Sequence, residues 1–148
     1  MITIRNTQRK ISIDVEKLHQ DAQVILNALR YHDYDLGIWL ASDIRIRAYN
    51  RDYRNKDKVT DILSFPYHTE LKAGERIVPR SPEDRNLGDL IIAPSYVHHD
   101  LARWNQSFEK RMQVLLVHGI CHLLGYDHIK DEDYKVMKRK ETTLLKKL

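Results

Sequence analysis

The segment from residue 107 to residue 128 constrains the fold more than any other part of the chain. Its apolar residues recur at three- and four-residue steps, as on one wide face of an α-helix: Met112, Leu115, Leu116, Ile120, Leu123 and Leu124. Ser107 can cap the start of this helix, and Gly125 can end it, because glycine turns there at no steric cost. The pattern predicts a long helix that packs its apolar face against the core.

Three histidines lie at the end of this predicted helix: His118, His122 and His128. Side chains four residues apart lie on one face of a helix, so the first two imidazoles can point at one metal ion. Beyond Gly125 the chain can turn back and bring His128 to the same point. Three histidine ligands leave the fourth position of a tetrahedral zinc open, which is typical of catalytic sites. We therefore expect one Zn²⁺ ion per chain, although imidazole also suits other divalent metals.

The same spacing occurs in metzincin proteases, which carry His-Glu-x-x-His-x-x-Gly-x-x-His, but Gly119 replaces the glutamate that serves as general base. Peptide hydrolysis is therefore not expected, and the pattern favours another hydrolytic reaction. Cys121 turns onto a neighbouring helix face and is expected to fill the core rather than to bind metal. Asp127 has two interpretations, as an acceptor for a ligand imidazole or as an exposed turn residue.

Elsewhere the chain alternates between strand and helix patterns. Short apolar segments predict four strands, at residues 2–5, 35–40, 62–65 and 87–93. Amphipathic periodicity predicts helices at residues 15–29, with Ser12 or Asp14 as the cap, and at residues 131–148. Residues 67–86 are polar and aperiodic and are expected to form a long loop.

Two segments are less regular. A helix is expected from Ser42 or Asp43 onward, although residues 44–48 also alternate as in a strand. In the helical interpretation its inward residues are Ile46, Tyr49 and Tyr53. Pro94 suits the first position of a short helix that ends before Ser107.

Composition limits the class of protein. A chain of 148 residues, without internal repeats, is expected to form one domain over residues 1–148. The chain is 42% hydrophobic and has five glycines and four prolines, which excludes collagen-like and disordered classes. A single cysteine permits no internal disulfide. No run approaches the about 18–20 apolar residues of a membrane span, and the start does not resemble a signal peptide. A cytoplasmic protein without membrane contact is therefore expected, with an organelle as the alternative compartment.

Positive charge is concentrated in one part of the chain. The formal net charge is +4, which by itself is only a weak indication of a polyanionic partner. The basic segment, residues 45–58, contains Arg45, Arg47, Arg51, Arg54, Lys56 and Lys58. It suits a phosphate backbone, and a solvated helix face is the alternative interpretation. The candidate RNA-binding residues are Arg47, Arg51, Lys56 and Lys58.

Three motifs together resemble one family. Residues 118–128 fit His-Gly-x-x-His-Leu-x-Gly-Tyr-Asp-His at every specified position. Residues 50–66 are similar to Asn-x-x-Tyr-Arg-x-x-Asp-x-Pro-Thr-Asp-Val-Leu-Ser-Phe-Pro, with Val59 in place of the proline. Gly88-Asp89-Leu90 is the third motif. On these residues the chain resembles the YbeY family of metal-dependent endoribonucleases.

The resemblance implies an activity and a fold. The activity is that of a single-strand-specific endoribonuclease in rRNA processing, 16S rRNA 3′-end maturation and ribosome quality control, with the small ribosomal subunit and assembly proteins as partners. DNA is not an expected substrate. The implied fold is α+β and zincin-like, with a small mixed four-stranded sheet and a central helix that carries two of the zinc ligands.

Two further residues are candidates for the site. Arg54 matches the family's functional arginine, and its guanidinium can stabilise negative charge on a phosphate. Asp89 can assist proton transfer or orient a ligand, or it can cap backbone amides at a strand end. Two alternatives remain at this point: an RNA- or ribosome-binding assembly factor with a structural zinc, and a zinc hydrolase for a small molecule or peptide.

Overall fold

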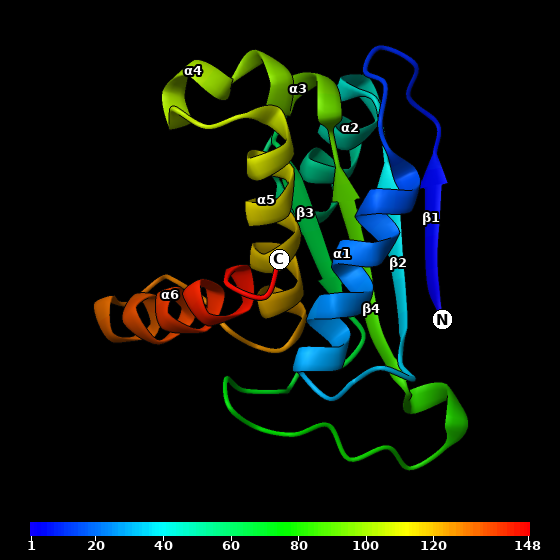
Figure 1. The fold of residues 1–148 in the computed structure, drawn as a ribbon, viewed down its shortest axis with the longest axis vertical. Coiled ribbons are helices and arrows are strands. Elements are labelled where there is room, and N and C mark those ends of the chain that lie inside the picture. Colours follow the sequence, from blue (N-terminus) through cyan, green and yellow to red (C-terminus); the bar gives the residue numbers. More distant parts are fainter.

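A four-stranded mixed sheet forms the centre of the fold in the computed structural model, which describes residues 1–148 (Figure 1). The strands are β1 (Ile2–Asn6), β2 (Asp35–Leu40), β3 (Ile62–Pro66) and β4 (Asn86–Ile92). Their order across the sheet is β1-β2-β4-β3. The first three in this order are parallel, whereas β3 pairs antiparallel with β4 at the edge. The predicted α+β class with a small mixed sheet is confirmed.

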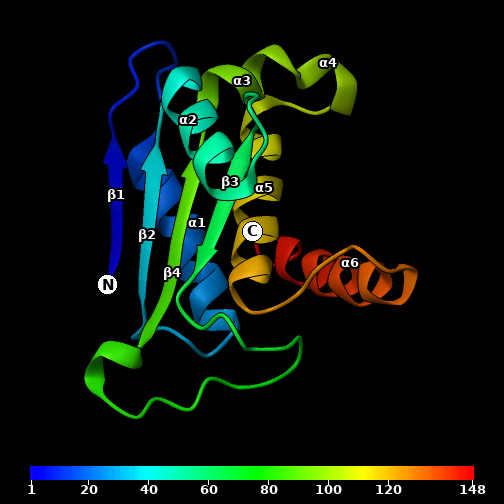
Figure 2. The same cartoon turned by 180° about the vertical axis from the view of Figure 1, so that it is seen from behind.

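Helices cover the two faces of this sheet unequally. They are α1 (Val15–Ala28), α2 (Asp43–Arg54), α3 (Pro94–His99), α4 (Leu101–Trp104), α5 (Phe108–Leu123) and α6 (Asp131–Leu145). The helices α1 and α5 lie against one face (Figure 1), and α2 lies on the opposite face (Figure 2). Helix α6 packs against α5 and extends away from the sheet.

The helix starts follow the predicted capping chemistry. The side chains of Asp14, Ser42 and Ser107 accept hydrogen bonds from backbone N–H groups three residues later, at 3.0, 3.3 and 3.1 Å. The helical interpretation of residues 43–54 is thus confirmed, and Ile44, which a buried strand would cover, is 82% exposed.

Two details differ from the sequence expectations. The segment after Pro94 forms two short helices, α3 and α4, because the helix is interrupted at Asp100. Tyr53 was expected to face inward but is 67% exposed. Its ring contacts Tyr49 and Phe65, at centroid distances of 5.7 and 5.4 Å, and its outer side remains open to solvent.

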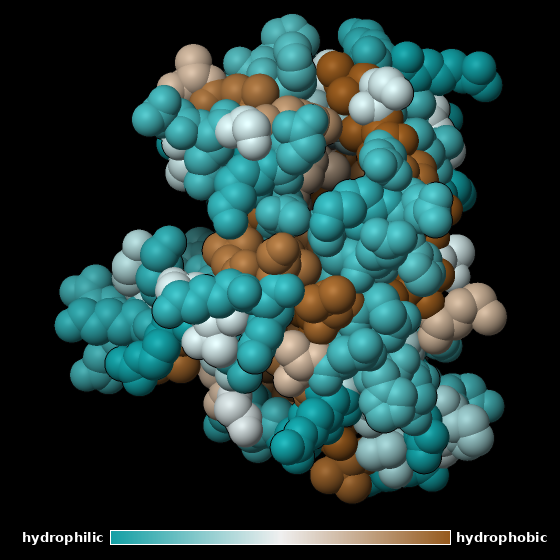
Figure 3. Space-filling view, viewed as in Figure 1, coloured by the Kyte–Doolittle hydropathy of each residue, from teal (hydrophilic) through white to brown (hydrophobic).

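The hydrophobic core lies mainly between the sheet and the α1–α5 layer, and a smaller cluster under α2 contains Ala41, Ile46, Leu63, Ile91 and Ala93. The surface over α1 and α5 is predominantly hydrophilic, with hydrophobic side chains in separate patches (Figure 3). None of the helices is long and apolar enough to cross a bilayer.

Helix α5 approaches the sheet closely at Gly119. A Cβ atom at this position would lie 2.8 Å from Cδ1 of Ile62 in β3 and 2.8 Å from Cδ2 of Leu90 in β4. Contacts that short do not occur in relaxed structures, so glycine sets the distance between helix and sheet. This packing fixes the position of the last turns of α5 relative to β3.

Candidate active site

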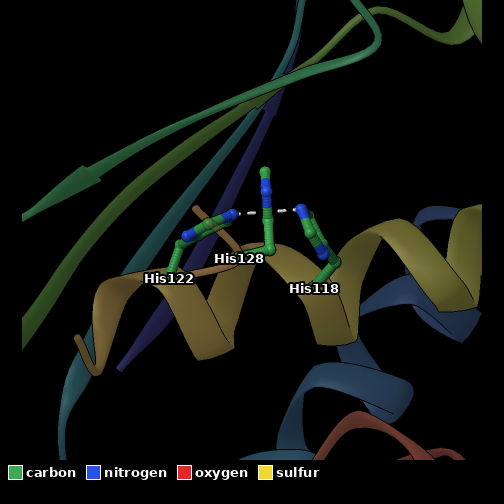
Figure 4. A group of neighbouring side chains, drawn as sticks. All are labelled: His118, His122 and His128. Atoms are coloured by element: carbon green, nitrogen blue, oxygen red, sulfur yellow. Dashed lines mark hydrogen bonds between the residues drawn. The ribbon is translucent and has the colours of Figure 1, made fainter. Parts of the chain in front are cut away.

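The three predicted histidines converge in the structure (Figure 4). His118 and His122 stand one turn apart on α5, and His128 lies in the connection between α5 and α6. One nitrogen atom from each ring lies within 4.8 Å of those of the other two, and the Nε2 atoms of His118 and His122 are 3.1 Å apart. The spacing of the motif thus produces a three-imidazole cluster.

The turn that returns His128 to the cluster depends on Gly125. This residue has φ +91°, in the left-handed region that favours glycine. A Cβ atom there would also overlap the backbone carbonyl of Leu71 in the long loop. Gly125 therefore ends α5 as predicted and allows the loop to pack across the end of the helix.

Hydrogen bonds on the far side of two rings fix their orientation. Nδ1 of His118 is 2.8 Å from Oε2 of Glu141, and Nδ1 of His122 is 2.9 Å from the backbone oxygen of Tyr126. Both oxygens can accept a hydrogen bond from Nδ1, which turns the Nε2 atoms, themselves within hydrogen-bonding distance of each other, toward the cluster. This is the arrangement of metal-binding histidines, and the donor set fits a divalent ion.

The ionisation state of His122 also suits a ligand. Burial, followed by the charges of His118 and His128, lowers the pKa of His122 to about 4. The imidazole is therefore neutral at neutral pH, as metal binding requires.

The cluster lies in a cleft of about 1270 Å³. Its walls include the three histidines, residues of β3, the loop at 68–73 and the start of α6. Arg54, at the end of α2, lines the same cleft. It forms no ion pair or hydrogen bond within the protein, so its guanidinium is available to a ligand. The structure therefore brings Arg54 and the histidines together, as the sequence predicts.

The four candidate RNA-binding residues do not line this cleft. Arg47 pairs with Asp57 at 2.9 Å, and Arg51 pairs with Asp52 at 3.0 Å, all with exposed side chains. Lys56 and Lys58 are exposed and unpaired, in the loop that follows Arg54. That loop is anchored to α2 because Nδ2 of the buried Asn50 donates to the oxygen of Lys58 at 3.0 Å.

The structure does not bring Asp89 to the cluster. In β4 its neighbour Leu90 faces α5, so Asp89 points to the opposite face of the sheet. There its carboxylate lies over Gly37 of β2 and lines a separate pocket with Trp39 and other aromatic residues. It caps no backbone amide, since it makes no hydrogen bond in the structure. This position is incompatible with direct proton transfer at the histidines.

Asp127 and Cys121 both have structural roles. For Asp127 this decides between the two interpretations of the sequence, and for Cys121 it agrees with the expected core position. Oδ1 of Asp127 accepts from the backbone N–H of Ile129 at 3.2 Å, which makes it a turn residue. Cys121 is fully buried, and burial raises the pKa of its thiol to about 12. A thiol that stays protonated is a core residue rather than a metal ligand.

Sequence reasoning missed Glu141, the hydrogen-bond partner of His118. It lies on the inward stripe of α6, between the buried residues Met137 and Leu144. A carboxylate within an apolar stripe is the one signal that could have identified it.

We expect Gly119→Glu, which restores the metzincin sequence, to destabilise the fold rather than create a protease. The new side chain would enter the contact between Ile62 and Leu90, so the free energy of unfolding should fall by more than about 3 kcal/mol. Denaturant titration measures this loss. Lys110→Glu, at an exposed position of the same helix, is the control and should change stability little. A G119E variant that is as stable as the parent would contradict the packing argument.

Comparisons with known proteins agree with the geometry. The family model described as "Endoribonuclease YbeY" matches residues 3–148. The human protein named Endoribonuclease YbeY is 37% identical over 147 residues, which cover 99% of this chain and 87% of the relative. The protein of that name from Syntrophotalea carbinolica is 36% identical over 150 residues, covering 100% of this chain and 95% of the relative.

A solved structure supports the same assignment. The solution structure of TM1509 from Thermotoga maritima superposes with a TM-score of 0.66 at 28% identity, covering 99% of this chain and 88% of that one. The sequence resemblance is thereby confirmed, and the activity for which the human and Syntrophotalea carbinolica relatives are named is cleavage within an RNA chain. The chain belongs to the YbeY family of endoribonucleases.

Proposed function

We propose that this protein is a zinc-dependent endoribonuclease that cleaves single-stranded RNA during ribosomal RNA processing, including maturation of the 16S rRNA 3′ end. One observation carries the proposal: three imidazoles converge within 4.8 Å in a cleft that also contains an unpaired arginine, Arg54. That combination suits a reaction in which water attacks a phosphodiester and negative charge grows on the phosphate oxygens.

The metal would be held by His118, His122 and His128. When bound, zinc lowers the pKa of a water molecule in its open position toward about 7 and offsets charge on the phosphate. The protein's part is to hold these rings in one tautomer and to leave the cleft side of the cluster accessible. Gly119 contributes no general base from the helix, and Asp89 faces away, so neither residue has a place in the proton transfer.

Arg54 binds the non-bridging oxygens of the scissile phosphate in this proposal. Its guanidinium can donate two parallel hydrogen bonds to a phosphate. Because it has no partner within the protein, this interaction breaks no existing ion pair.

The basic segment holds the flanking RNA in this proposal. Lys56 and Lys58 are free to contact phosphates directly. The pairs of Arg47 with Asp57 and of Arg51 with Asp52 are exposed, and ion pairs between exposed side chains contribute little, so phosphates can replace the aspartates. The small ribosomal subunit and its assembly proteins are the proposed partners, with the cytoplasm as the compartment and residues 1–148 acting as one domain.

The test is incubation of the purified protein with end-labelled RNA, single-stranded and double-stranded, with and without a chelator. We expect cleavage of the single strand, loss of cleavage in the chelator and recovery when zinc is added back. Single-stranded DNA of the same sequence should remain intact. Cleavage that persists in the metal-stripped protein would refute zinc dependence.

The alternative of an assembly factor with a structural zinc makes the opposite prediction. In that case the metal-loaded protein binds RNA without cutting it, and a variant without nuclease activity restores normal ribosome profiles in cells that lack the protein. Our proposal requires that such a variant fail to do so.

A further inference from the structure

Glu141 lies behind the histidine cluster, on the side of His118 that faces away from the other two rings. It belongs to α6, 23 residues along the chain from its partner, and its side chain is 14% exposed. Oε2 lies 2.8 Å from Nδ1 of His118. The contact joins the C-terminal helix to the proposed metal site.

The three imidazoles have different partners. Nδ1 of His122 donates to a neutral backbone oxygen, and His128 has no hydrogen bond. His118 alone is backed by a carboxylate. A carboxylate at this position holds the proton on Nδ1, fixes the rotation of the ring and makes Nε2 a stronger donor to a cation.

The cost of placing Glu141 here argues that it is more than a packing residue. Its neighbours on the inward stripe of α6, Met137 and Leu144, are 1% and 2% exposed. A carboxylate among such residues loses hydration, and an apolar side chain of similar size would pack there at no such cost. Its one hydrogen bond is to His118, so the interaction that offsets the lost hydration of the carboxylate lies at the histidine cluster.

We infer that Glu141 is a positioning residue of the metal site, which orients His118 and strengthens its bond to a divalent cation. The inference rests on the proposed metal-dependent function and extends it to α6. It also predicts that metal binding strengthens the docking of α6 on α5, because metal and helix bind opposite nitrogens of the same ring.

Two substitutions test this role through metal affinity rather than activity. Glu141→Ala removes the acceptor, and Glu141→Gln keeps an oxygen acceptor without the charge. Competition against a chromophoric chelator should show zinc affinity lower by about 10–100-fold in E141A, and by less in E141Q. Glu132→Gln is the matched control, since Glu132 is exposed on the same helix, and its affinity should equal that of the parent.

Two further measurements separate positioning from a structural role. The thermal midpoint of the metal-free protein should be unchanged or higher in E141Q, because a partly buried charge is removed. The visible spectrum of the cobalt-loaded protein should shift in both Glu141 variants and not in E132Q, since the ligand field senses the charge behind the imidazole.

The outcomes distinguish this inference from the proposed function. A parent protein that binds one zinc ion, with Glu141 variants of equal affinity, would overturn the inference and leave the function standing. The inference would also be overturned if the loss of zinc affinity in a Glu141 variant were fully explained by unfolding of its metal-free form. A parent protein that binds no divalent metal would refute the proposed function and this inference together.

Discussion

Replacing His118 and His122 together by alanine is expected to abolish RNA cleavage, with a rate lower by about 10³-fold or more. The two rings face one another across 3.1 Å and supply two of the three proposed ligands, so the variant should no longer retain zinc. Without the metal, nothing in the cleft lowers the pKa of water. Cleavage of labelled single-stranded RNA and metal content per chain, measured on the same preparations, check both parts of this expectation.

The matched control removes two histidines that have no part in the site. His19 and His32 are exposed and form no hydrogen bonds, so the double alanine variant should keep both zinc and activity. Circular dichroism of the two double variants would verify that each is folded. If H118A/H122A cleaved RNA at the parent's rate, the activity would have to come from a contaminating nuclease, and the metal-nuclease proposal would be refuted.

Local sequence rules were sufficient for the histidine cluster. The helix period places His118 and His122 on one face, and a glycine in the left-handed region turns the chain so that His128 follows. All the groups involved lie within eleven consecutive residues, so no long-range contact had to be known. The cap residues Asp14, Ser42 and Ser107 were predictable for the same reason, since each bonds to a group three residues away.

The residues that were misplaced or missed depend on contacts between distant segments. Strand periodicity puts Asp89 and Leu90 on opposite faces, but only the docking of α5 decides which face holds the histidines. Tyr53 continues the inward stripe of α2, yet nothing packs on its outer side. Glu141 acts through a helix that follows the motif, and its hydrogen bond to His118 cannot be inferred from spacing.

Gly119 lacks the chemical function of a glutamate but has a structural role. In the sequence it marks the loss of a protease base. In the structure it is the point where α5 packs closely against β3 and β4. A Cβ atom added at this position would lie 2.8 Å from a side-chain atom of Ile62 and 2.8 Å from one of Leu90. A glutamate at this position would have to push aside the side chains of Ile62 and Leu90, and with glycine there the cluster receives no base from position 119.

Arg54→Glu is expected to lower the rate of RNA cleavage by about 10²–10³-fold while zinc content stays at the parent's level. Arg54 shares the cleft with the histidines but contacts none of them, so its removal should leave the metal site intact. Arg54→Lys keeps the charge and loses the two-pronged geometry, and its rate should fall between those of the parent and R54E. Single-turnover cleavage at saturating protein measures the chemical step separately from RNA affinity.

Arg45→Glu is the control that makes this result interpretable. Arg45 is exposed on the same helix and outside the cleft, so R45E makes the same charge change in the basic segment without touching the proposed phosphate site. Both variants should bind RNA more weakly than the parent at low salt, because each subtracts positive charge from a phosphate-binding surface. Only R54E should be slow once the protein is saturating. If R54E recovers the parent's single-turnover rate at saturation, as R45E should, then Arg54 binds the RNA strand and another group must stabilise the charge that develops at the scissile phosphate.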